Sequence, residues 1–333
     1  MNNLSPIDLA YLRETAERAA WSAGDYVQGQ VGQGHAAEHK PGAQSRAAQV
    51  VTEVDRRAQA IILGHLAEPT LQYGLGLLTE ESADDQSRLT QSHFWCVDPL
   101  DGTLAFTEGR PGYAVSIALV SQAGDPVVGV VYVPDEQLTY SAVAGQGVQR
   151  NGQPFVRPAA QEVADLQVYM DGSFVQAPYY EAVKGRLAAW VTSSGMPPSP
   201  GPAGRLSHPS PPVAKDPATG WTRSHRGGGP EGPLVHYHLG YGAVRNALAV
   251  LESPLGCYFK YPKPQPGAGS LWDYAATRLF FEELGLPVSD AQGQPLHLNR
   301  PETTFMHQVG VVYATEADLA EAIVAWGSEF GKI

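Results

Sequence analysis

The stretch that most constrains this chain runs from Trp95 to Thr103 and reads Trp-Cys-Val-Asp-Pro-Leu-Asp-Gly-Thr. It places the carboxylates of Asp98 and Asp101 three residues apart, across a proline and next to a glycine. A turn of that composition can aim both carboxylates, and the carbonyl of Leu100 between them, at one point. Hard oxygen ligands that converge in this way are what Mg²⁺ requires. The stretch therefore predicts a site where a metal, with a hydroxyl beside it, activates water against a phosphate ester.

The composition indicates a folded chain with many turns. Its 333 residues are enough for one large domain or two closely packed halves, and 43% of them are hydrophobic. Only 17% are charged, whereas the chain holds 36 glycines and 27 prolines. That excess of glycine and proline predicts at least one long loop as well as the turns.

The charge balance argues against a nucleic acid polymer as partner. The formal net charge is −12, and the chain has no cluster of five or more lysines and arginines. An anionic small molecule is not excluded, because bound cations reverse the local sign of a site.

No run approaches the ~18 apolar residues of a membrane span, and the N-terminal residues lack the pattern of a signal peptide. With only Cys96 and Cys257, both interpreted as reduced packing thiols, we expect a cytoplasmic protein without a zinc site.

The N-terminal half reads as helices followed by a meander of strands. Ser5 to Asp8 is a helix start, and the helix should end before Gly29. A loop is expected over 29–48, then a short strand and a helix over 50–66. Apolar runs and alternation predict strands, the last four joined by turns, at 75–78, 94–97, 113–119, 126–133, 138–143 and 148–155.

A change in composition after residue 155 suggests a second half, so we expect an N-terminal half over 1–155 and a C-terminal half over 156–333. Strands are predicted at 168–170, 256–261 and 309–313, and helices at 179–190, 241–251, 271–284 and 317–326. Residues 195–233 are rich in Pro, Gly, Ser and His and have almost no apolar periodicity. They are interpreted as a flexible insertion or a lid.

Five acidic residues lie at the ends of predicted elements, where side chains can point into a shared cleft. Each also has an ordinary structural explanation, as a helix cap, a solvated loop tip, a turn former or an acid in the first turn of a helix. Together they are the right number of carboxylates to hold two or three Mg²⁺ ions. The five are Asp55, Glu80, Asp98, Asp101 and Asp273.

Four segments in this order resemble the inositol monophosphatase superfamily, which includes inositol monophosphatases, 3'(2'),5'-bisphosphate nucleotidases and fructose-1,6-bisphosphatases. The similarity extends from residue 5 to about 315, and the Asp-Pro-Leu-Asp-Gly-Thr element is highly specific. The segments are Val51-Thr-Glu-Val-Asp55, Thr79-Glu-Glu-Ser82, the stretch Trp95–Phe106 and Leu271-Trp-Asp-Tyr-Ala-Ala276.

The resemblance implies roles for individual residues. Glu80 would be a metal ligand, Asp98 would bridge two ions, and the carbonyl of Leu100 would bind the first ion. Asp101 and Asp273 would hold the second ion.

The same resemblance implies the reaction machinery. Thr103, hydrogen-bonded to Asp55, would position and deprotonate the attacking water. The N–H groups of Gly102 and Thr103 would contact the phosphate. The reaction would be an in-line attack of metal-activated water on phosphorus, without a covalent enzyme intermediate.

This sequence departs from the family pattern, and residues 195–233 have no assigned counterpart in it. Thr79 stands where the family usually has Gly before the pair of glutamates. The substrate-facing Gly-Ser/Thr element has only a loose match at Gly240-Tyr241-Gly242. Arg245, which follows, either contacts an anionic substrate or lies on an exposed helix face.

The resemblance implies a layered α/β/α/β/α sandwich, α+β in its first half and α/β in its second, with the metal site at their junction. It implies a Mg²⁺-dependent phosphomonoesterase for a small anionic phosphate ester, either an inositol monophosphate or 3'-phosphoadenosine 5'-phosphate. Inhibition by lithium is expected, and a homodimer is compatible with the sequence. Two alternatives stay open: a sugar bisphosphatase, and a non-catalytic binding protein of the same fold.

Overall fold

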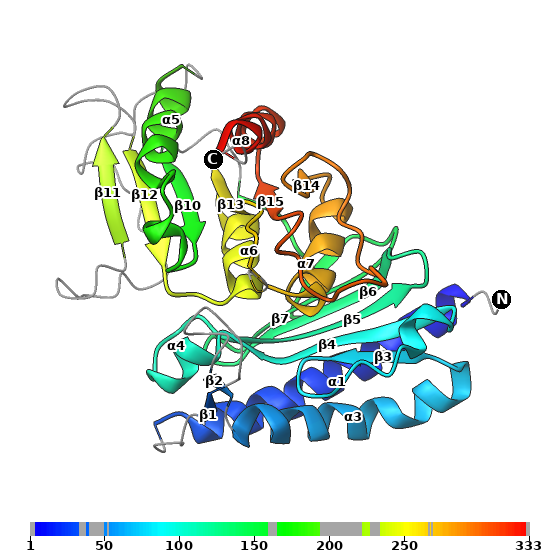
Figure 1. Cartoon of the computed structure of the whole chain (residues 1–333). Coiled ribbons are helices and arrows are strands. Elements are labelled where there is room, and N and C mark those ends of the chain that lie inside the picture. Colours follow the sequence, from blue (N-terminus) through cyan, green and yellow to red (C-terminus); the bar gives the residue numbers. More distant parts are fainter. Residues whose placement is uncertain are drawn as a thin grey trace.

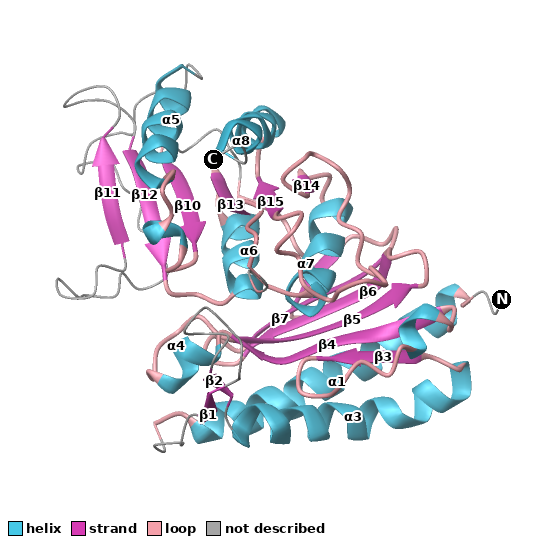
Figure 2. Ribbon diagram, viewed as in Figure 1, coloured by secondary structure: helices cyan, strands magenta, loops and turns pink. Residues whose placement is uncertain are grey.

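The protein is a stack of five alternating layers of helix and sheet, seen from the side in Figure 1. This confirms the predicted α/β/α/β/α sandwich. Figure 2 shows the strands of the two main sheets as two groups with helices between them. The computed structural model describes residues 4–32, 38–39, 50–51, 53–158, 165–193, 222–226, 234–265, 267 and 269–330.

The first sheet has seven strands in sequential order, because each strand pairs with the next along the chain. Its first pair, β3 and β4, is parallel, and all later pairs are antiparallel. The strands are β3 (Gly76–Thr79), β4 (His93–Asp101), β5 (Ala114–Ser121), β6 (Pro126–Val133), β7 (Leu138–Val143), β8 (Val148–Arg150) and β9 (Gln153–Pro154).

Two long helices, α1 (Pro6–Gln30) and α3 (Glu53–Tyr73), cover one face of this sheet. Helix α1 begins with the predicted capping box, in which Ser5 and Asp8 satisfy each other's backbone N–H groups. Alternate residues of β4 point to opposite faces of the sheet. Trp95 and Val97 pack toward these two helices, whereas Phe94 and Cys96 pack toward the helices on the other face. The strand is therefore buried on both sides and reads as a continuous apolar run.

The second sheet has six strands in the order β11-β12-β10-β13-β15-β14. Its three central strands are parallel, so their carboxyl ends meet at one edge. The strands are β10 (Leu166–Met170), β11 (Thr222–Arg226), β12 (Leu234–Leu239), β13 (Gly256–Lys260), β14 (Val288–Ser289) and β15 (Val311–Ala314).

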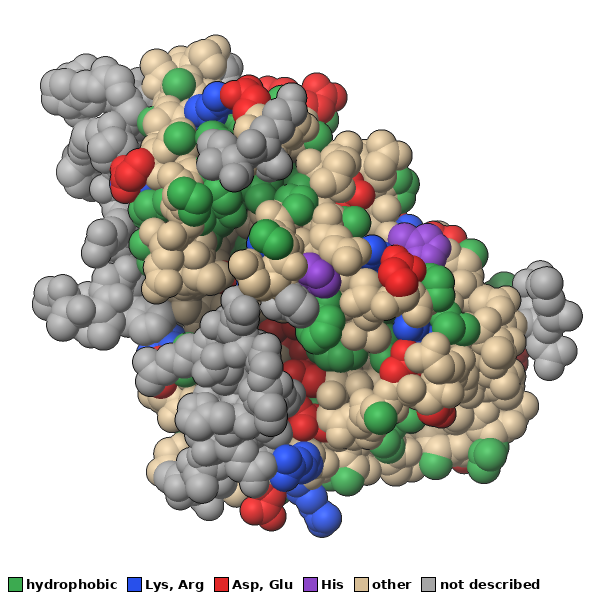
Figure 3. Space-filling view, in the orientation of Figure 1, with side chains coloured by type: hydrophobic (Ala, Val, Ile, Leu, Met, Phe, Trp, Pro, Cys, Tyr) green, Lys and Arg blue, Asp and Glu red, His purple; other side chains and the backbone are tan. Residues whose placement is uncertain are grey.

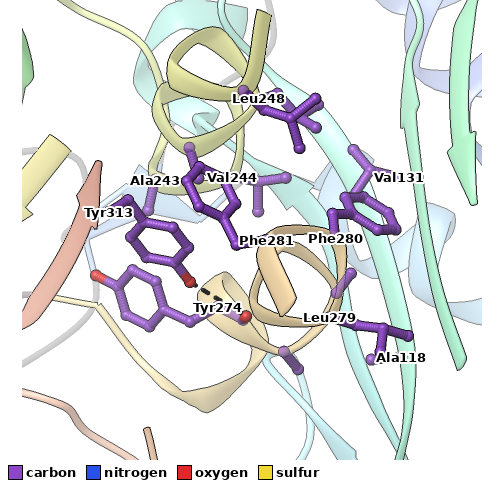
Figure 4. Packing of buried hydrophobic residues seen from close by; sticks show 14 of the residues in the cluster. Ala118, Val131, Ala243, Val244, Leu248, Tyr274, Leu279, Phe280, Phe281 and Tyr313 are labelled. Carbon is purple, nitrogen blue, oxygen red and sulfur yellow. Dashed lines mark hydrogen bonds between the residues drawn. The ribbon is translucent and has the colours of Figure 1, made fainter. Parts of the chain in front are cut away.

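The middle layer consists of α6 (Ala243–Glu252) and α7 (Leu271–Glu283), which lie between the two sheets. Their apolar side chains form one core with both sheets, including Tyr313 from the second sheet and Val131 from the first (Figure 4). Helices α5 (Tyr180–Ser193) and α8 (Ala317–Phe330) cover the outer face of the second sheet. Cys96 and Cys257 are both buried and not joined in a disulfide.

Several element boundaries differ from the prediction. Helix α1 continues through Gly29 to Gln30, and the N–H of Val31 at its end bonds the carbonyl of Gln28. Strand β4 does not end at Asp98 but continues through a bulge to Asp101. A short helix, α4 (Thr103–Thr107), and a short strand, β14, were missed because each is only a few residues long.

The two predicted loops lie mostly outside the described residues. Within 29–48, residues 29–30 belong to α1 and Glu38–His39 forms β1, which pairs with β2 (Val50–Val51), so the prediction of a loop is wrong at these residues. Within 195–233, Thr222–Arg226 is strand β11 at the edge of the second sheet, so the prediction of a loop is wrong there. The division of the chain at residue 155 falls between β9 and β10 and stays a prediction.

We expect Phe280→Ala to lower the free energy of unfolding by about 3–5 kcal/mol. Phe280 lies on α7 within the core, and its ring centroid is 6.4 Å from that of Tyr140 on β7, so its removal leaves a cavity between layers. Urea unfolding measures the change. Phe305→Ala is the control, because that side chain is 39% exposed and its loss should change stability by less than about 0.5 kcal/mol. Equal effects would contradict the assignment of the core.

Candidate metal and phosphate site

Three carboxylates meet between the first sheet and the middle layer. One carboxylate oxygen each from Asp98, Asp101 and Asp273 lies within 4.8 Å of the other two. Asp98 and Asp101 come from the end of β4, and Asp273 comes from the first turn of α7. Figure 3 shows acidic side chains gathered in a recess near the middle of the molecule. Residues 98 and 273, far apart in the sequence, are thus brought together by the stacking of α7 on the sheet.

The bulge in β4 sets the orientation of Asp98. Its carboxylate accepts the N–H of Leu100 at 3.0 Å, and Pro99 between them has no N–H to compete. Glu80 follows β3, and its N–H bonds the carbonyl of Val97. Because Thr79 pairs with Val97 in the parallel ladder, the next residues along both strands, Glu80 and Asp98, are neighbours.

The carboxylate of Asp101 is held by the N-terminus of α6. It accepts backbone N–H groups from Ala243 at 2.8 Å, Val244 at 2.9 Å and Arg245 at 3.4 Å. These are the N–H groups that an α-helix leaves without an internal partner, and they carry the positive end of its dipole. Gly242 precedes them, and a Cβ at that position would lie only 2.1 Å from a carboxylate oxygen of Asp101.

Asp273 has the same kind of anchor on its own helix. It is the third residue of α7 and forms a capping box with Ser270, accepting that residue's backbone N–H. The capping role and the metal-ligand role are therefore compatible, because a carboxylate has lone pairs for both.

Crowding of buried carboxylates changes their acidity. Burial, followed by the charge of Glu80, raises the pKa of Asp98 well above its usual value. Burial and the charge of Asp273 do the same to the pKa of Asp101, although the N–H groups of α6 oppose the shift. Burial raises the pKa of Asp273 to about 6, with Lys260 opposing the increase. A divalent cation between these groups would favour their ionised forms and so oppose all three shifts, and the donor set fits Mg²⁺.

Thr103 and Asp55 form a pair beside the acids. The hydroxyl of Thr103 lies 3.1 Å from a carboxylate oxygen of Asp55, in the first turn of α3, and 3.1 Å from the carbonyl of Leu100. Both neighbours are acceptors, so the hydroxyl donates its one proton to either and keeps lone pairs for a further donor.

The predicted substrate-facing residues lie on two backbone segments that touch. Gly102 has φ +82° and precedes α4, and a Cβ there would lie 2.5 Å from the carbonyl of Gly112. That same carbonyl accepts the N–H of Gly242 at 2.8 Å. Gly240 and Tyr241 belong to this link between β12 and α6, and the ring of Tyr241 packs against Gly112.

Arg245 is not on an exposed helix face, and that alternative is wrong. The side chain is buried, 2.6 Å from Glu136 at one guanidinium nitrogen and 2.9 Å from Glu252 at the other. These glutamates already balance its charge and direct it away from a free anion. Contact of Arg245 with an anionic substrate stays a prediction, and the ion pairs with Glu136 and Glu252 disfavour it. Two histidines of β12 are also paired: His236 lies 3.1 Å from Asp165 and His238 lies 2.7 Å from Gln167.

Sequence reasoning missed residues that position the site. Gln59 on α3 accepts the N–H of Glu81 at 3.0 Å and so supports the turn that carries Glu80. Gly112 and Gly242 permit close backbone contact between the two segments around Asp101. Lys260 ends β13 and acts electrostatically on Asp273. A glycine and a lone lysine have no local pattern that marks such roles, so only the tertiary contacts identify them.

The chain belongs to the inositol monophosphatase family. The sequence model of that family, described as "Inositol monophosphatase family", matches residues 8–177, which include four of the five predicted acids. A match over half of the chain, together with the five-layer fold, carries this assignment.

Individual relatives match over shorter parts. Inositol monophosphatase 2 of Solanum lycopersicum is 32% identical over 177 residues, covering 52% of this chain and 64% of the relative. The Nus factor SuhB of Escherichia coli is 40% identical over 102 residues, covering 31% of this chain and 37% of the relative. The chain thus spans less than two thirds of the length of each of these curated relatives.

The fold extends across almost the whole chain. The solved structure of a Thermotoga maritima IMPase superimposes with a TM-score of 0.64 at 17% identity, covering 96% of this chain and 97% of that one. Among the described residues, no helix is both long and apolar enough to cross a membrane.

We expect Gly242→Ala to weaken Mg²⁺ binding roughly 10- to 100-fold, as loss of groups that orient metal ligands does. The new Cβ would overlap the carboxylate of Asp101 and displace it. Isothermal titration calorimetry with Mg²⁺ measures the change. Gly185→Ala on α5 is the matched control, because nothing lies within 4 Å of a Cβ there. Unchanged affinity in Gly242→Ala would show that Asp101 is not a ligand.

We expect Mg²⁺ to raise the melting temperature more at pH 8 than at pH 5. The carboxyls of Asp98, Asp101 and Asp273 have raised pKa values, so the folded protein binds their protons more tightly than the unfolded chain does. Without metal, the contribution of Asp273 to stability therefore falls as pH rises from 3.8 through about 6. The contributions of Asp98 and Asp101 also fall as pH rises above 3.8. Metal offsets that loss only where the groups are ionised. Thermal melts at both pH values, with and without Mg²⁺, test this, and an equal increase at both would contradict it.

Proposed function

We propose that this protein is a Mg²⁺-dependent phosphomonoesterase that hydrolyses a small anionic phosphate ester. The observation that carries the proposal is the cluster of Asp98, Asp101 and Asp273, with ligand atoms within 4.8 Å, next to the Thr103–Asp55 pair. Carboxylates that crowd together in a buried place are unfavourable without a cation. A hydroxyl–carboxylate pair beside them supplies the group that a hydrolytic reaction also needs.

In this proposal the metal is held by Asp98, Asp101, Asp273, Glu80 and the carbonyl of Leu100. When bound there, Mg²⁺ supplies Lewis-acid activation of water and neutralises charge on the phosphate. Membership of the inositol monophosphatase family supports a metal-dependent phosphatase. A donor set made only of oxygen supports Mg²⁺ as the metal.

Thr103 and Asp55 orient the attacking water and receive its proton. The hydroxyl of Thr103 donates to Asp55 and accepts a hydrogen bond from the water, so a proton leaving the water passes through Thr103 to the carboxylate. The carbonyl of Leu100, 3.1 Å from the same hydroxyl, limits where the hydroxyl can lie.

The start of α4 offers N–H groups to the phosphate. Gly102 and Thr103 lie at the N-terminus of this short helix, where backbone N–H groups lack helical partners. They are next to Asp101 in the chain, so a phosphate bound there would adjoin the metal ligands. Gly102 is required by its positive φ of 82° and by its close contact with Gly112.

The substrate we favour is an inositol monophosphate, with 3'-phosphoadenosine 5'-phosphate as the second choice. The name of the tomato relative, an inositol monophosphatase, supports the first. A sugar bisphosphatase would need basic residues for a second phosphate, whereas Arg245 and Lys260 already have acidic partners. The relatives named Nus factor SuhB keep a binding role open beside catalysis.

We expect Asp101→Asn to reduce kcat by at least roughly 100-fold while the protein stays folded. The substitution removes one negative charge from the metal ligands, and it relieves repulsion among buried carboxylates, so the fold without metal is not weakened. Phosphate release with and without Mg²⁺ measures the change. Asp318→Asn, exposed at the start of α8, is the matched control. Wild-type kcat in Asp101→Asn would show that Asp101 only anchors α6.

A substrate panel ranked by kcat/KM tests the proposed substrate class. Inositol monophosphates, 3'-phosphoadenosine 5'-phosphate and sugar bisphosphates form its three arms, with Li⁺ added in parallel as the expected inhibitor. Mg²⁺-dependent release from none of them would overturn the proposal and favour the binding role.

A further inference from the structure

One cation lies close to the acidic site without being required by the proposed chemistry. Lys260 is the last residue of β13, and its ammonium nitrogen lies 2.6 Å from a carboxylate oxygen of Asp171. The side chain is only 12% exposed. A buried lysine is rare and needs a compensating partner, so its position calls for an explanation.

The parallel sheet brings Lys260 and Asp171 together. In the register of β10 with β13, Val168 pairs with Cys257 and Tyr169 with Tyr258. Two residues further along both strands are Asp171 and Lys260, at the carboxyl edge of the sheet. Asp171 also lies 3.4 Å from the side-chain nitrogen of Asn246.

Two aromatic rings direct the ammonium group toward α7. Its nitrogen lies 5.7 Å from the ring centroid of Tyr274 and 5.8 Å from that of Tyr258, within the range of cation–π attraction. Tyr274 is labelled in Figure 4, where it packs beside Tyr313 at the middle layer. Asp273 precedes Tyr274 in the first turn of α7, and the positive charge of Lys260 opposes the increase in the pKa values of Asp273 and Asp101.

We propose that Lys260 is a fixed internal cation of the acidic site, held by Asp171, which stabilises the clustered carboxylates without metal and weakens their affinity for divalent metal. This inference rests on the proposed metal site. The charged groups that face Lys260 are Asp171, Asp101, Asp273 and, three residues along the chain, Lys263. Lys260 is a positioning residue, because it contacts Asp171 and the two rings rather than a metal ligand.

The two charges of the pair should affect metal binding in opposite directions. Lys260→Met removes a positive charge and should tighten Mg²⁺ binding, with a Kd lower by roughly tenfold, since charges a few ångströms apart interact strongly where water is excluded. Asp171→Asn removes a negative charge and should raise the Kd. The double variant removes both charges and should return close to the wild-type value. If the pair were only a link between β10 and β13, both single variants would change affinity in the same direction or not at all.

Isothermal titration calorimetry with Mg²⁺ on the full chain measures these affinities, and thermal melts without metal give a second readout. Lys260→Met should lower the metal-free melting temperature and enlarge the increase produced by Mg²⁺. Lys184→Met is the matched control, because Lys184 pairs with Glu181 on α5 and the change in net charge is the same.

The outcomes separate this inference from the proposed function. If the wild type binds Mg²⁺ and Lys260→Met binds it with equal or lower affinity, only the inference about Lys260 is overturned. No Mg²⁺ binding by the wild type would overturn both. Should Lys260→Met fail to fold, Asp171→Asn still decides the question, since tighter or equal binding in that variant contradicts the inference.

Discussion

One carboxylate oxygen each from Asp98, Asp101 and Asp273 lies within 4.8 Å of the other two, with Asp98 and Asp101 buried and Asp273 half-buried, so the ionised groups repel one another strongly. Backbone N–H groups at the start of α6 hold Asp101, and Ser270 at the start of α7 holds Asp273. Both helices thereby direct the positive ends of their dipoles toward the acids. These contacts reduce the repulsion without removing it, which leaves a strong preference for a bound cation.

The five layers explain how one site can use both sheets. The first sheet supplies Asp98, Asp101 and Glu80 from the ends of neighbouring strands. The middle layer supplies Asp273 and the N–H groups that hold Asp101. The carboxyl edge of the second sheet supplies Lys260. Because α6 and α7 pack against both sheets, apolar burial in the middle layer determines the distances among charged groups.

The elements around the acids were predicted well from the sequence, and the residues that orient them were not. The strand before Asp98, the helix after Ser270 and the hairpin of β5 and β6 follow from apolar periodicity, which local burial dictates. The extension of β4 to Asp101 depends on pairing with β5, and Asp-Pro by itself favours a turn. The ion pairs of Arg245 were in neither alternative considered for it, because a lone arginine on a helix gives no sign of its glutamate partners.

The sequence alone provided the five candidate acids, which residue type and position along the chain identify. The order of the layers and the reaction to expect came from the resemblance of four segments to the inositol monophosphatase superfamily. Only the tertiary structure decided what surrounds the acids. The three N–H groups at Asp101, the close contact at Gly242 and the ion pair of Lys260 with Asp171 join segments more than 80 residues apart. Spacing along the chain carries no information about such contacts, since they arise when separate layers pack together.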